Sequence, residues 1–340
     1  MAKCTHTLMV NKPGKGAVQY TYAFGQTKNI QLLLSATGFS ITAELTRVYS
    51  KEEMLSGNSY LFSDAIKKAL LLYLLKYNKT PQIKTITVKV DDREETDSFD
   101  KTVKPPFYSM ISGELQRPLS AAFAGDELFC YLLRTPKTKY DKRIAALFAF
   151  LCSKSKAYET ERFIYLWTSL NGMYGWISEL VAAHKGISKD MAEYKQLLAF
   201  QQFLDVGSAT MAKEDKVPIA QEVIALLKKM DLECASKSAI EGSELAKKIE
   251  SNLVRSKGGT YNLSAYGYLL TQLSYYFRCK IIHGSKPVYL FSYADDPELH
   301  CLKIINKLLE EYIDSALPQW FVEKYINDSI LPKIPDITIK

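Results

Sequence analysis

Apolar and polar side chains alternate with a period of two along much of the first third of the chain. Residues 17–24, 29–35 and 40–49 are rich in β-branched and aromatic side chains and are separated by glycines. Residues 83–90 alternate strictly between apolar and polar side chains, which is typical of a strand that is buried on one face only. The pattern therefore predicts strands over these four segments.

The rest of this first third lacks the alternation. Residues 63–77 form a largely apolar segment in which Lys67 and Lys68 mark one polar side, and this predicts a helix. Residues 91–106 are charged and end in proline, which is typical of a loop. The first third is thus predicted to be a small mixed domain of three or four strands and one or two helices.

From about residue 119 onward, apolar positions recur at helical spacing and the strand pattern nearly disappears. The last predicted helix begins at Asp295-Asp296-Pro297-Glu298, where carboxylates lie at the positive end of the helix dipole. The predicted helices cover residues 119–134, 141–155, 158–184, 190–206, 215–230, 243–256, 263–283 and 295–316. We therefore predict an α+β protein, with a small N-terminal mixed α/β domain over residues 1–138 and a mostly α-helical domain over residues 139–340.

Length and composition agree with this division. A chain of 340 residues exceeds the size at which single cores usually stop growing, so two domains are expected. The N-terminus lacks the apolar core of a signal peptide, and the longest apolar runs, such as residues 69–75, are too short to span a bilayer. Six scattered cysteines form no CxxC pair and are typical of free thiols in a reducing compartment. We therefore expect a cytoplasmic protein with no membrane partner.

The net charge of +7 is distributed unevenly along the chain. Residues 1–140 contain 19 Lys and Arg against 13 Asp and Glu, whereas residues 141–340 contain 25 against 24. A basic first domain fits contact with nucleic acid or another polyanion. A solvated, lysine-rich surface accounts for the same excess, so the charge leaves both interpretations open.

Arg278 and His283 lie five residues apart near the end of the predicted helix 263–283, and Gly284 follows at once. A guanidinium can hold a phosphate through two oxygens, and an imidazole can move a proton near neutral pH. Together in one pocket they would suffice to cleave RNA without a metal. A histidine at a helix end can also serve only to stabilise the helix dipole, so this spacing has two interpretations.

The predicted helix 158–184 carries a second pattern, Trp167-x3-Asn171-x2-Tyr174-Gly175. Asn171 lies beside an apolar stripe of this helix, where an amide needs a hydrogen-bonding partner. It could orient His283 or bind a phosphate oxygen. It could equally cap a neighbouring helix, and the sequence leaves these roles open.

Together, these two helices resemble the HEPN (higher eukaryotes and prokaryotes nucleotide-binding) superfamily over residues 141–316. The similarity is greatest to a bacterial branch in which an aromatic-Trp-x3-Asn/Glu-x2-Tyr helix precedes an Arg-Asn-x3-His-Gly helix. One position departs from that pattern, because the residue after the arginine is often polar in the family and is Cys279 here.

The resemblance implies a metal-independent endoribonuclease with Arg278, His283 and Asn171 as its catalytic residues. Arg278 would stabilise the charged transition state, and His283 would act as general base or acid, leaving a 2′,3′-cyclic phosphate and a 5′-hydroxyl. Such proteins often serve as toxins or antiviral defence effectors, whose companion domain responds to a trigger ligand or protein. The alternative is a non-catalytic HEPN module that binds nucleotides or mediates assembly, and Cys279 favours it slightly.

The five-residue spacing also bears on assembly. On a regular helix this spacing places two side chains about 140° apart, so Arg278 and His283 would not share one face. HEPN ribonucleases usually join two protomers around one cleft, and the resemblance therefore implies a homodimer. The predicted helices 158–184 and 263–283 would line its interface.

No metal or other cofactor is expected. Cys279, His283, His300 and Cys301 have the chemistry of zinc ligands. However, the adjacent His300 and Cys301 would point about 100° apart on a helix and would rarely bind one ion. The chain also lacks the motif of a phosphate-binding loop.

Overall fold

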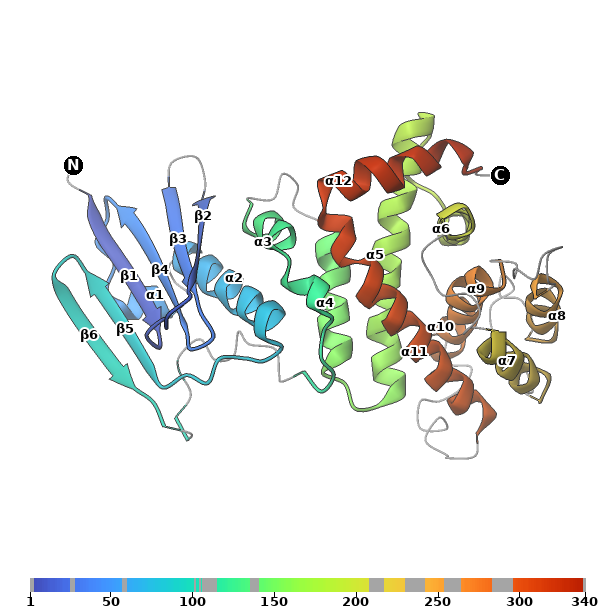
Figure 1. Cartoon of the computed structure of the whole chain (residues 1–340), viewed down its shortest axis with the longest axis horizontal. Coiled ribbons are helices and arrows are strands. Elements are labelled where there is room, and N and C mark those ends of the chain that lie inside the picture. The colour runs from blue at the N-terminus through green and yellow to red at the C-terminus, as the bar shows by residue number, and fades with distance from the viewer. Residues whose placement is uncertain are drawn as a thin grey trace. The chain divides into compact units, whose positions relative to one another are not determined.

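The computed structural model describes residues 3–24, 28–56, 60–100, 102–103, 105, 115–134, 141–207, 217–229, 242–253, 264–282 and 296–338. The chain forms two compact units, residues 1–140 and residues 141–340. Figure 1 shows a sheet with a few helices in the first unit and helices throughout the described parts of the second. The predicted α+β class is therefore confirmed.

The first unit is built on a six-stranded antiparallel sheet in the order β2-β3-β4-β1-β5-β6. Leu8 of the central strand β1 pairs with Ile41 of β4 and with Val88 of β5, so three apolar side chains form one row on the buried face. The strands are β1 Cys4–Val10, β2 Val18–Phe24, β3 Lys28–Leu34, β4 Phe39–Leu45, β5 Thr85–Val90 and β6 Arg93–Ser98.

Helices pack on this sheet and on one another. Between β4 and β5 lie α1 (Lys51–Leu55) and α2 (Tyr60–Tyr77), and α2 contacts β3 and β4. The short helices η2 (Ala121–Ala124) and α3 (Asp126–Leu133) pack against α2. The core of the unit therefore lies between the sheet and α2 (Figure 1).

Two predictions for this unit were wrong. The sheet has six strands rather than three or four, because β1 and β6 were missed. In β1 the inward positions include the buried polar residue His6, which hides the alternation. Strand β6 falls within the predicted loop 91–106; it is a charged edge strand with no buried residue, so it carries no apolar pattern. Backbone pairing with β5 across the two-residue turn Asp91-Asp92 defines it.

The second unit consists of helices over most of its described length. The long helices agree with the predicted ranges to within a few residues. Within the predicted helix 263–283, a π turn separates two α-helical segments. The elements are α4 Lys142–Lys154, α5 Glu159–Lys185, α6 Glu193–Gly207, α7 Val217–Lys229, α8 Gly242–Asn252, α9 Ser264–Tyr268, η4 Leu269–Leu273, α10 Ser274–Ile282, α11 Pro297–Ala316, η6 Pro318–Phe321, α12 Glu323–Tyr325, η7 Ile326–Ile330 and η8 Leu331–Asp336.

Local sequence explains where several of these helices begin and end. The Asp296 side chain accepts a hydrogen bond from the Glu298 amide and caps α11, with Pro297 in the first turn, as the sequence predicts. Gly186 ends α5 at φ +64°, a conformation that favours glycine. After α11, Pro318, Pro332 and Pro335 limit the chain to short helical turns.

Helix α5 is the centre of the second unit. It is 27 residues long and contacts α4, α6, α10 and α11. Phe163, Leu166, Leu170 and Tyr174 are completely or almost completely buried along its length. No helix in the described ranges is long and apolar enough to cross a membrane.

Candidate functional site

Arg278 lies on α10 and forms an ion pair with Glu193, in the first turn of α6. The distance from Arg278 Nη2 to Glu193 Oε2 is 3.3 Å, and both side chains are partly exposed, at 22% and 31%. Burial acts to lower the Arg278 pKa, but the negative Glu193 and the neighbouring Cys279 outweigh it, so the pKa is raised. The guanidinium is therefore a permanent cation at the edge of solvent.

Tyr174 of α5 also contacts Glu193 of this pair. Its hydroxyl donates a hydrogen bond of 2.9 Å to Glu193 Oε1, while its ring is fully buried. Burial and the adjacent Glu193 carboxylate raise the pKa of the Tyr174 hydroxyl, which remains a neutral donor. Each oxygen of the Glu193 carboxylate thus has one partner, Tyr174 or Arg278.

Two further aromatic rings, those of Trp167 and Tyr275, lie next to this group. The Trp167 ring lies 5.8 Å from the Tyr174 ring and 6.2 Å from the Tyr275 ring, between centroids. The Arg278 Cζ atom lies 5.7 Å from the centroid of the Tyr275 ring. These five residues, Trp167, Tyr174, Glu193, Tyr275 and Arg278, are called the Arg278 cluster below. Through them, the two patterned helices of the sequence meet at one site.

Asn171 belongs to the same side of α5 but does not join the cluster through a hydrogen bond. It follows Trp167 by four residues and precedes Tyr174 by three, which places it next to both on a helix. The residue is exposed, and its amide makes no hydrogen bond to any residue that the structure describes. Because His283 lies outside the described residues, the roles of orienting His283 or binding a phosphate oxygen stay predictions. Capping of a neighbouring helix by Asn171 is not observed within the described ranges.

His283, the other predicted catalytic residue, lies outside the described residues, as does Gly284. It follows Ile282, the last residue of α10, directly in the sequence. The structure therefore brings Arg278 together with the Trp167 and Tyr174 helix but gives no geometry for the Arg278-His283 pair.

The π turn η4 and the following helix α10, which carries Arg278, each contact α6. Near the π turn, Thr271 Oγ1 and Gln272 Nε2 each lie 3.4 Å from Gln201 Oε1 of α6. Thr271 Oγ1 also donates to the Gly267 carbonyl at 2.6 Å, within the widened turn. With the Arg278–Glu193 pair at the other level, these contacts fix the register between α6 and α10.

A buried ion pair holds the end of α10. The Lys280 ammonium donates to Glu298 of α11, and both side chains are almost completely buried. In the sequence, Lys280 precedes and Glu298 follows the segment that contains His283. The adjacent Cys279 is also fully buried, so the position that is often polar in the HEPN pattern faces the core here.

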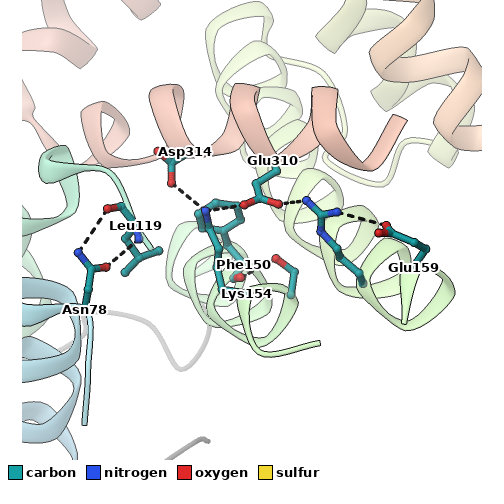
Figure 2. Close-up of polar contacts among 9 residues, drawn as sticks. Asn78, Leu119, Phe150, Lys154, Glu159, Glu310 and Asp314 are labelled. Carbon is teal, nitrogen blue, oxygen red and sulfur yellow. Dashed lines mark hydrogen bonds and ion pairs between the residues drawn. The ribbon is translucent and has the colours of Figure 1, made fainter. Parts of the chain in front are cut away.

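A larger charged group, formed by Lys154 of α4, Arg162 of α5 and Glu310 of α11, lies elsewhere in the unit (Figure 2). Glu310 accepts hydrogen bonds from both cations; Lys154 also pairs with Asp314, and Arg162 with Glu159. Because Lys154 and Arg162 are buried and matched by carboxylates, this group serves to join three helices rather than to bind a ligand.

Neither Glu193 nor Lys280 was predicted as a site residue from the sequence. Glu193 is 19 residues from Tyr174 and its partner Arg278 is 85 residues further on, so no local pattern connects them.

Among the described residues, no group of three or more His, Cys, Asp or Glu side chains is arranged to hold a metal ion. Comparisons with known protein families, with curated proteins and with solved structures gave no match.

Proposed function

We propose that the chain is a metal-independent endoribonuclease of HEPN type. The observation that carries the proposal is the Arg278 cluster, in which the Trp167-x3-Asn171-x2-Tyr174 helix and the Arg278 helix meet at a partly exposed guanidinium. A guanidinium held in place by a carboxylate and lying at a solvent boundary is suited to bind a phosphate diester.

In this proposal Arg278 binds the scissile phosphate and stabilises the charge that develops on it. His283 moves a proton from the attacking 2′-hydroxyl or to the leaving 5′-oxygen. Asn171, exposed beside Trp167 and Tyr174, contacts a phosphate oxygen or orients His283. The products are a 2′,3′-cyclic phosphate and a 5′-hydroxyl. The substrate is RNA in the cytoplasm, and the biological role is that of a toxin or antiviral defence effector.

Glu193 supports a second candidate, a non-catalytic HEPN module that binds nucleotides or mediates assembly. Its carboxylate pairs with the Nη2 group of the Arg278 guanidinium, which a bound phosphate would otherwise contact. If a phosphate cannot displace Glu193 from Arg278, the ion pair only stabilises the packing of the helical unit. If it can, Glu193 positions Arg278 until RNA binds.

The test is RNA cleavage by the purified protein in excess EDTA. We expect cleavage to persist without a divalent metal and to be lost in Arg278→Ala and His283→Ala. Arg47→Ala is the matched control, because it removes the arginine of another exposed Arg–Glu pair, Arg47–Glu53. Circular dichroism would show that the variants are folded.

The outcomes separate the two candidates. Activity that returns only with Mg²⁺, Mn²⁺ or Zn²⁺ would contradict the metal-independent reaction. If the wild-type protein cleaves no RNA but binds nucleotides, and Arg278→Ala abolishes that binding, the non-catalytic module is correct. Glu193→Gln adds a direct test, because removing the competing charge should tighten RNA binding if Glu193 is displaced. In a bacterial host, His283→Ala should relieve the toxicity of an active enzyme.

A further inference from the structure

The first unit contains a cavity of about 910 Å³ whose lining is unrelated to the helical unit. It is bordered by the C-terminal end of α2, the loop from α2 to β5, the turn between β3 and β4, and the chain that follows β6. This volume is within the range of sites that bind small molecules.

The floor of the cavity is apolar and held in place. Tyr73, Pro81, Ile83 and Pro105 are buried, and Phe99 is half-buried beside them. The Tyr73 hydroxyl donates a hydrogen bond of 2.8 Å to the Ala36 carbonyl, which fixes the ring. The half-buried Phe99 ring offers a flat surface against which a planar ligand can pack.

The loop that forms one wall is fixed by Asn11. Its amide nitrogen donates to the Gln82 carbonyl at 2.9 Å, and its amide oxygen accepts hydrogen bonds from the Lys84 and Thr85 amides at 2.8 and 3.1 Å. The Lys84 carbonyl in turn accepts a hydrogen bond from the Phe99 amide. The protein itself therefore pairs the Gln82 and Lys84 carbonyls and the Lys84 and Thr85 amides, which holds this wall in place.

The side chains of this wall remain available. Those of Lys79, Thr80, Gln82 and Lys84 make no hydrogen bond or ion pair to any residue that the structure describes, and all four line the cavity. Asp100 is the one carboxylate among the described residues of the lining. Its Oδ1 atom accepts hydrogen bonds from the Thr102 hydroxyl and from the Thr102 and Val103 amides, which lower its pKa and occupy it in a turn. Among the described lining residues, two lysines therefore face the cavity against one engaged carboxylate.

We propose that this cavity binds a small organic anion with a flat apolar body, the class to which nucleoside monophosphates belong. The apolar floor accepts the flat body, and Lys79 and Lys84 hold the anionic group through charge-assisted hydrogen bonds. The site does not depend on the proposed ribonuclease activity, because none of its lining residues belongs to the helical unit.

The test is isothermal titration calorimetry of the full chain with AMP, and separately with adenosine and with inorganic phosphate. We expect saturable binding of AMP and at least about ten-fold weaker binding of the other two, since each lacks one half of the recognised chemistry. Lys84→Glu should weaken AMP binding about ten-fold or more. Lys67→Glu, which makes the same charge change at an exposed position of α2 outside the cavity, should leave it unchanged.

Four results with the wild-type and Lys84→Glu proteins would overturn the proposal. These are no saturable binding of AMP, equal binding of adenosine, equal binding of phosphate, and an unchanged affinity in Lys84→Glu. Arg278→Ala separates this site from the Arg278 cluster. Retained AMP binding in that variant supports the cavity, whereas loss of binding would assign AMP to the helical unit and refute the inference.

Discussion

Glu310 is the carboxylate on which two buried cations of the helical unit converge. On α11, Glu310 accepts hydrogen bonds from Lys154 of α4 and from the guanidinium of Arg162 on α5, and Figure 2 shows Lys154 beside Glu310. Lys154 is only 3% exposed, so little water can replace a lost partner. Buried charges of this kind are costly when one partner is removed, although the intact group adds little net stability.

We predict that Glu310→Ala lowers the free energy of unfolding by about 3 kcal/mol. The loss is near the low end of the range for buried pairs, because Lys154 keeps Asp314 at 3.3 Å and Arg162 keeps Glu159 at 3.2 Å. Urea denaturation followed by circular dichroism measures the change. Glu250→Ala is the control, since its pair with Lys228 is exposed and should contribute less than about 1 kcal/mol. Equal effects of the two substitutions would contradict the role of burial.

At the scale of elements, glycines let α4 and α5 approach closely. A Cβ atom on Gly172 would lie 2.7 Å from the Lys142 carbonyl oxygen and 2.9 Å from the Ala146 Cβ. One turn away, Ser169 Oγ donates to the Ala146 carbonyl at 2.8 Å, which confirms that the two backbones are close. The glycine after Asn171 in the HEPN-like pattern therefore has a packing role.

We predict that Gly172→Ala destabilises the protein by about 1–2 kcal/mol, because the clash with the backbone outweighs the higher helix propensity of alanine. Gly175→Ala is the matched control on the same helix. Its Cβ would meet only the Lys142 side chain, with Nζ at 3.0 Å, and this side chain can move. The control should therefore be neutral or slightly stabilising. Thermal unfolding of both variants decides the matter, and a stabilising Gly172→Ala would refute the close packing.

For the whole molecule, only a small part of the α5 surface is exposed and able to contribute to the proposed homodimer interface. Most of α5 is covered by other helices, and its exposed strip up to residue 171 includes Glu161, Thr168 and Asn171. An interface along α5 must therefore pass over this strip, beside the Arg278 cluster. The nearly balanced charge of residues 141–340 favours such contact between two copies, whereas the basic first unit would repel its own copy.

We predict a mass of about 77 kDa in light scattering at micromolar concentration, twice the 38.5 kDa of one chain. Thr168→Arg should convert the dimer to a monomer by placing a bulky charge in the exposed strip. His184→Arg, which alters an exposed residue near the end of the same helix, should leave the dimer intact. A monomeric wild-type protein that still cleaves RNA would show that Arg278 and His283 converge within one chain.

The fold class and the long helices of the second unit could be predicted from the sequence alone, whereas the short helical turns of residues 318–336 were not predicted. The long helices bury an apolar stripe, and burial imposes a period that can be read directly, as in α5 and α11. Asp296 and Pro297 marked the start of α11 for an equally local reason, because capping acts between neighbouring residues. Arg278 was predicted as a site residue in the same way, from spacing along one helix, and that prediction stays untested.

Only the tertiary structure decided which distant residues meet. Strand β6 exists because its backbone pairs with β5, and that pairing leaves no trace in its exposed, charged side chains. Glu193 reaches Arg278 because α6 packs beside α10, although 85 residues separate them. The exposure of Asn171 also depends on where the surrounding helices end. Periodicity records which face of an element is buried, but not which other element covers it, and the candidate site is made of such long-range contacts.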